Sequence, residues 1–164
     1  MKTILIGCVA GLLLASAGAL EAHHSLANFD TTTAVRVRGT IVLVRLVNPH
    51  SIIFLDQTSK DGRVQRWAIE GPTPGTLRRI GVKELKPGDV IEVCGYVTKD
   101  GINDVRTIDT AAISATAKVR MPTSLSGRLL DGELVIMPDG HQQRWSDYGE
   151  HKCLGPDYQD NHRK

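Results

Sequence analysis

Residues 35–56 constrain the fold of this chain most, because two β-rich runs flank Asn48-Pro49-His50. Valine, isoleucine and threonine favour extended strands, whereas proline lacks the N–H group that a regular β-ladder requires. Proline also biases the preceding residue away from helical conformation. The pattern predicts strands over about residues 34–47 and 51–57, meeting at a sharp corner that contains His50.

The first run changes the face of its apolar positions near Gly39. Val35 and Val37 share one face of an extended strand, whereas Val42 and Val44 lie on positions of the opposite parity. A glycine at such a switch is typical of a bulge or of strong coiling. We therefore expect an irregularity in the first strand close to Gly39.

A short helix is predicted after the third strand. Thr73 stands at the N-cap position, Pro74 at the first helical position and Gly81 just beyond Ile80. Threonine and proline are typical of helix starts, and glycine is typical of helix ends.

The order of the elements predicts an all-β fold with one short helix. A third strand is expected over 64–70 after an Asp-Gly turn, a fourth over 90–97 and a fifth over 105–114. A helix between strands three and four is the order of the OB-fold, a five-stranded Greek-key barrel. An open β-sandwich is the alternative, since many short strands could also build one.

The chain is expected to form one domain behind a leader. Residues 1–22 form the leader, residues 23–116 the OB-like barrel, and residues 117–164 a small β-hairpin with a polar tail. The hairpin is expected to turn at Pro138-Asp139-Gly140. About 142 residues behind the leader suffice for one hydrophobic core.

The leader has the pattern of a secretory signal peptide. Lys2 precedes an apolar stretch over residues 3–14, and small residues over 15–22 offer cleavage sites after residues 17 to 22. A membrane anchor needs roughly 20 consecutive apolar residues, so no transmembrane anchor is expected after processing. An uncleaved anchor is the alternative. The interpretation predicts a periplasmic or secreted protein.

Cys94 and Cys153 are the cysteines that remain after the leader, which contains Cys8, is removed. Exported proteins meet an oxidising environment in which thiols pair. A disulfide between Cys94 and Cys153 is therefore predicted, and two unrelated thiols are the alternative.

Composition and motifs argue against nucleic-acid binding and hydrolysis. The net charge is +2, and the chain has 2 Trp, 3 Tyr and 2 Phe residues. OB-folds that bind single strands need a basic groove with aromatic stacking platforms. The sequence lacks a nucleophile elbow, a phosphate-cradling glycine loop and a zinc-protease motif. We expect no nucleic-acid partner and favour a non-enzymatic function, with a redox or hydrolytic enzyme as the third alternative.

Histidines give the most specific functional hypothesis. His23 and His24 follow the leader, and His50 lies at the strand corner. Imidazole suits copper, zinc and nickel. We predict a divalent metal site at these histidines, with copper favoured and zinc as the other candidate. The alternative is that His50 caps the corner by hydrogen bonding while His23 and His24 are solvated.

Glu70 is a weaker candidate for the same site. It ends the third strand and could serve as an extra ligand or as a group that orients a ligand. The alternative is a surface carboxylate close to Arg78 or Arg79.

Several short motifs together resemble DUF6152, a family of small exported bacterial proteins of unknown function. The motifs are His23-His24-Ser25, Phe29-Asp30, Asn48-Pro49-His50-Ser51, Trp67-Ala68-Ile69-Glu70-Gly71, Leu77-Arg78-Arg79-Ile80-Gly81, Lys86-Pro87-Gly88-Asp89 and Pro138-Asp139-Gly140. The resemblance covers roughly residues 22–110. It departs from the family pattern between Ala117 and Leu134 and in the tail with Cys153. It implies export and an OB-like β fold, and it transfers no activity.

Two functions of different classes follow from the sequence. The first is a non-enzymatic, exported binding module for a metal ion or small ligand. The second is a structural or interaction protein of the cell envelope that holds no metal and docks a protein partner through strand edges and the tail.

Overall fold

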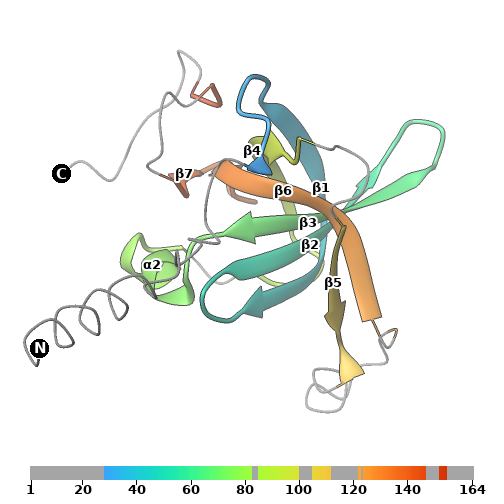
Figure 1. The fold of residues 1–164 in the computed structure, drawn as a ribbon, viewed down its shortest axis with the longest axis horizontal. Coiled ribbons are helices and arrows are strands. Elements are labelled where there is room, and N and C mark those ends of the chain that lie inside the picture. Colours follow the sequence, from blue (N-terminus) through green and yellow to red (C-terminus); the bar gives the residue numbers. More distant parts are fainter. Residues whose placement is uncertain are drawn as a thin grey trace, which may run out of the picture.

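The computed structural model describes residues 28–82, 85–99, 105–111, 122, 124–146 and 152–154. Within these residues seven strands belong to one sheet, accompanied by one short helix (Figure 1). The elements are β1 (Val35–Leu46), β2 (Ser51–Thr58), β3 (Val64–Gly71), α2 (Pro74–Arg79), β4 (Val90–Val97), β5 (Val105–Asp109), β6 (Ser124–Ile136) and β7 (Gln142–Arg144). The predicted all-β class with one short helix is confirmed. The leader over 1–22, His23 and His24 lie outside the described residues.

Five of these strands form a ring of pairings. β1 pairs antiparallel with β2 and β4, β2 pairs antiparallel with β3, and β4 pairs antiparallel with β6. The ring closes because β6 lies parallel to β3. β5 and β7 lie outside the ring and pair with β6, which curves across the molecule from β7 to β5 (Figure 1).

The strand that completes the ring is not the predicted one. We expected the fifth strand over 105–114, but β5 ends at Asp109 and joins β6 outside the ring, and residues 112–114 lie outside the described part. The ring is instead completed by β6, from the region expected to be a separate hairpin. The boundary expected between residues 116 and 117 therefore does not divide the β-structure.

The length and apolar character of β6 explain this difference. It has 13 residues and is continuous through Gly132-Glu133. Its register against β4 shifts beside Cys94 and Gly95. Buried leucines and a valine along β6 contribute to three apolar clusters, whereas β5 has only 5 residues. Burial of apolar area favours the longer strand in the ring. The expected hairpin is present as β6 paired with β7.

The local signals that surround α2 and the first hairpin are confirmed. Thr73 Oγ1 accepts a hydrogen bond from the Thr76 N–H at 3.1 Å, as an N-cap residue does. Gly81 and Gly62 have φ angles of 72° and 83°, which favour glycine. The irregularity of β1 lies between Ile41 and Leu43, slightly beyond the predicted position.

Apolar side chains pack on both sides of the ring. The larger cluster includes Ile53, Leu55, Ile69, Leu130 and Val135, and α2 contributes Leu77. A second cluster, here called the outer-face cluster, consists of Leu43, Ile52, Phe54, Ala68, Ile108, Leu125 and Leu129, with Phe29 and Val42 packed against it. Because side chains alternate along a strand, these two clusters occupy opposite faces of β2 and β3.

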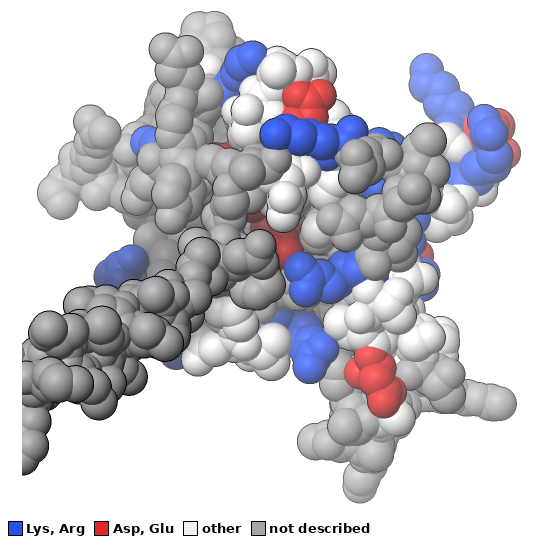
Figure 2. All heavy atoms as spheres, in the orientation of Figure 1, with Lys and Arg blue, Asp and Glu red and all other residues white. Residues whose placement is uncertain are grey.

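No helix in the described part of the chain has the length and apolar character needed to span a membrane. Basic side chains lie at several separate places over the face drawn in Figure 2, with acidic side chains between them. This distribution agrees with the small net charge of +2.

Candidate functional site

His50 and Glu70 lie on the same face of two neighbouring strands. Ile52 of β2 is the register partner of Glu70 of β3, and Ile52 belongs to the outer-face cluster. His50 precedes Ile52 by two positions, directly after the cis Asn48–Pro49 peptide bond. Residues two apart in extended chain point to one face. The corner therefore directs His50 to the side of the sheet that carries Glu70.

The carboxylate of Glu70 contacts two side chains, those of His50 and Arg106. Its Oε1 lies 3.1 Å from His50 Nδ1, and its Oε2 lies 2.6 Å from Arg106 Nη2. The side chain of Glu70 is 14% exposed, against 29% for His50 and 43% for Arg106. A largely buried carboxylate is costly unless it is paired and hydrogen-bonded. His50 and Arg106 therefore each contact one oxygen of the Glu70 side chain.

Arg106 reaches this place because β6 passes very close to β3. Arg106 is the register partner of Gly127, and a Cβ atom on Gly127 would lie 2.7 Å from the Trp67 carbonyl carbon. The neighbouring Arg128 packs its guanidinium over the Trp67 ring, 5.2 Å from the ring centroid. Glycine thus permits the close approach that brings β5, and Arg106 with it, beside Glu70.

Asp131 completes a polar group on the outer face, and we call His50, Glu70, Arg106 and Asp131 the outer-face polar group. Glu70 and Asp131 are register partners in the parallel pair of β3 and β6. Burial, followed by the negative charges of Glu133 and Glu70, raises the pKa of Asp131 to about 7. Asp131 therefore carries a proton in a large fraction of molecules near neutral pH.

Glu133 is the second carboxyl group of β6 in this region. Burial raises its pKa, and a hydrogen bond with Ser146 and the charge of Arg144 act in the opposite direction. Glu133 is buried, with 1% of its surface exposed. Arg144 belongs to β7 and Ser146 follows it closely, so both groups that act on Glu133 come from this part of the chain.

Sequence reasoning located part of this group and missed the rest. The sequence indicated His50 and Glu70, which the structure brings together. The alternative for Glu70 was a surface carboxylate close to Arg78 or Arg79, whereas the arginine that contacts it is Arg106. Glu70 and Arg106 are 36 positions apart. No local pattern marks Arg106 or Asp131, since both come to Glu70 only through the placement of β6.

The described residues do not by themselves form a metal cage. Among them, no group of three or more His, Cys, Asp or Glu side chains is arranged to hold a metal ion. His23 and His24, the other predicted ligands, lie outside the described part of the chain. A metal site at His50 would need ligands from that leading segment or from solvent.

The segment that follows His23 and His24 is attached to the ring. Phe29 forms a β-bridge with Thr98, and the Asn28 carbonyl accepts a hydrogen bond from Lys99 N–H at 2.9 Å. Phe29 also packs against the outer-face cluster, which contains Ile52 close to His50. Asn28 follows His24 by four positions, which corresponds to at most about 14 Å of extended chain. The described chain is therefore attached to the ring from Asn28 onward.

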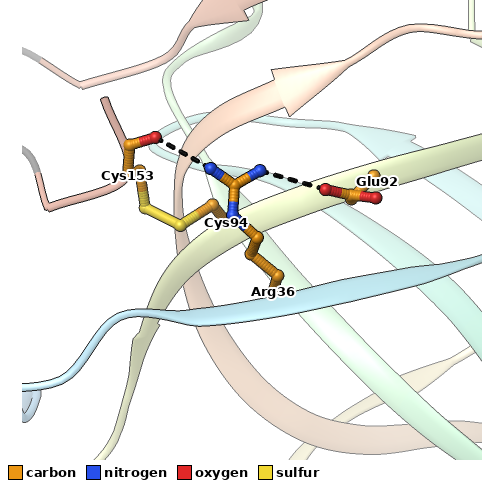
Figure 3. The surroundings of a disulfide bond; sticks show 4 residues. All are labelled: Arg36, Glu92, Cys94 and Cys153. Carbon is orange, nitrogen blue, oxygen red and sulfur yellow. Dashed lines mark hydrogen bonds and ion pairs between the residues drawn. A yellow bond between two sulfur atoms is a disulfide. The ribbon is translucent and has the colours of Figure 1, made fainter. Parts of the chain in front are cut away.

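A disulfide joins Cys94 of β4 to Cys153, with a Cα–Cα distance of 5.7 Å. Figure 3 shows the Arg36 guanidinium between the Cys153 carbonyl and the Glu92 carboxylate, at 3.2 and 3.1 Å. The disulfide engages Cys153, so its sulfur does not serve as a metal ligand.

The ring of strands, the single short helix and the polar group define a small all-β protein with a candidate binding site on the outer face of its sheet. The chain matches the model of a family of unknown function, DUF6152, over residues 10–106, and it belongs to this family. The match contains His50, Glu70 and Arg106, whereas Asp131 and Cys153 lie beyond it. A search of curated proteins finds no match.

Proposed function

We propose that this protein is an exported binding module that holds a divalent metal ion, with copper favoured and zinc second, beside the corner between β1 and β2. His50 supplies one ligand, and His23 and His24 supply the others from the segment that precedes Asn28. If the leader is removed after Ala22, the new α-amine of His23 joins them. Nitrogen-rich sites favour copper among divalent first-row ions.

The contact of 3.1 Å between His50 Nδ1 and Glu70 Oε1 is the observation that carries this proposal. Histidines that bind metals commonly donate their other ring N–H to a carboxylate, which fixes the ring and raises its basicity. The nitrogen that would coordinate the metal in such a pair is Nε2. His50 is also 29% exposed on its side chain, which leaves it accessible from solvent.

Calorimetric titration tests the proposal on the correctly processed protein. Intact mass first tests the expectation that the exported form lacks its first 17 to 22 residues. Cu(II) and Zn(II) are then titrated into the native chain, into His50→Ala and into His141→Ala. His141 lies in the turn before β7 and serves as the matched control. We expect His50→Ala to weaken Cu(II) binding by at least about tenfold and His141→Ala to leave it unchanged.

Equal and weak binding by the native chain and both variants would contradict the proposal. The docking function would then be the better account, because Leu46 and Val47 are 53% and 39% exposed directly before the same corner. Exposed apolar side chains next to each other favour contact with a partner surface. Metal content of the protein isolated from its native compartment separates the two functions, since a docking protein has no need of stoichiometric metal.

A further inference from the structure

We infer that Glu70 and Arg106 are positioning residues, which hold the His50 ring with its proton on Nδ1 so that Nε2 is the metal-binding nitrogen. The metal-binding part of this inference rests on the proposed function. The positioning itself is a property of the metal-free protein and can be measured separately.

The two carboxylate oxygens of Glu70 contact different side chains. Oε1 faces His50 Nδ1 at 3.1 Å, and Oε2 faces Arg106 Nη2 at 2.6 Å. An ionised carboxylate only accepts hydrogen bonds, so a neutral His50 must donate from Nδ1. A metal bound directly to Glu70 would have to displace one of these two groups. The geometry therefore assigns Glu70 to orientation of the ligand, which decides between the two roles that its sequence position allowed.

Arg106 holds the second oxygen of Glu70 and so fixes the orientation of its side chain. The arginine side chain is always charged, and it contacts a carboxylate that is 14% exposed. It comes from β5, outside the ring, and it is not a member of either apolar cluster of the sheet. Its substitution therefore removes no side chain from the apolar core, which makes Arg106 a suitable residue for the test.

Nitrogen NMR of the metal-free, processed protein tests the positioning. Histidine labelled with ¹⁵N reports which ring nitrogen carries the proton. We expect the Nδ1–H form of His50 in the native chain and in Arg106→Lys. We expect a mixture of both tautomers in Glu70→Gln and a smaller shift toward that mixture in Arg106→Gln. Arg78→Gln, which changes an exposed arginine on α2, is the matched control and should leave His50 unchanged.

Copper titration of the same variants tests the consequence. Glu70→Gln should weaken Cu(II) binding by about 10–100-fold, Arg106→Gln by a smaller factor, and Arg78→Gln not at all. An unchanged His50 tautomer in Glu70→Gln and Arg106→Gln would overturn the inference. So would complete loss of Cu(II) binding in Glu70→Gln with an unchanged tautomer, because Glu70 would then be a ligand. A native chain that shows the expected tautomers but binds no Cu(II) would refute the proposed function and leave the positioning established.

Discussion

Asp131 lies where burial and two neighbouring carboxylates act on one side chain. Its pKa is raised from 3.8 to about 7, first by burial and then by Glu133 and Glu70. A carboxyl group whose pKa is raised by folding binds its proton more tightly in the native state than in the unfolded state. Asp131 therefore contributes fully to the free energy of unfolding at pH values below its pKa in the unfolded chain. This contribution is lost as the pH rises through its pKa in the folded protein.

Asp131→Asn should therefore stabilise the protein increasingly as pH rises from about 4 to above 7. The asparagine cannot ionise beside Glu70 and Glu133, so the variant avoids the cost of a buried charge. We expect the variant to match the native chain near pH 4 and to exceed it by about 2–4 kcal/mol above pH 8. Denaturant unfolding at a series of pH values measures this difference. Parallel stability curves for the two proteins would contradict it.

Among the elements, β6 depends on close backbone contacts that only glycine permits. A Cβ atom on Gly95 of β4 would overlap the Asp131 carbonyl group, at the place where the register of β4 and β6 shifts. The contact lies within one of the pairings that complete the ring. The closure of the ring thus relies on a residue without a side chain.

Gly95→Ala should destabilise the protein by about 1–3 kcal/mol, because the backbone of β4 or β6 must shift to admit the methyl group. Gly75→Ala is the matched control, since its Cβ would meet only Thr73 Oγ1 at 3.6 Å, within α2. Alanine favours helix over glycine by up to about 1 kcal/mol, so this control should be neutral or stabilising. The midpoints of denaturant unfolding measure the effects of both substitutions on stability. Equal effects of the two substitutions would argue against a tight contact at Gly95.

At the scale of the whole molecule, residues 152–154 fasten to the segment that leads into β1. Besides the Cys94–Cys153 disulfide, Lys152 Nζ donates to the Thr32 carbonyl at 2.5 Å, and Arg36 donates to the Cys153 carbonyl at 3.2 Å. Both cysteines are buried, at 3% and 1% exposure. The disulfide therefore ties the later part of the chain to the face where β1 and β4 pair.

Replacement of both cysteines by serine should lower the free energy of unfolding by about 3–4 kcal/mol, since the bond closes a long loop in the unfolded chain. The sequence separation of the two residues is 59. Alkylation of the denatured native protein without reductant should label neither residue, and mass spectrometry detects this directly. Two labelled cysteines in the exported form would show that the bond is absent there.

Much of the local structure could be predicted because it depends on neighbouring residues. The proline corner before His50, the N-cap at Thr73 and the turn at Gly62 each follow from conformational limits of one or two residues. The predicted span of the fourth strand, residues 90–97, agrees with β4. Two of the four residues of the outer-face polar group, His50 and Glu70, could be predicted in the same way, since each lies at a strand end that the sequence indicates.

The sequence by itself determined the β-rich class, the single short helix and the position of the corner. Only the tertiary structure decided that β6, rather than β5, completes the ring, and that Arg106 and Asp131 join Glu70. The physical reason is that strand patterns specify which face is buried but not which strand lies alongside. The parallel pairing of Glu70 with Asp131 depends on burial and close approach across distant parts of the chain, which no local pattern encodes.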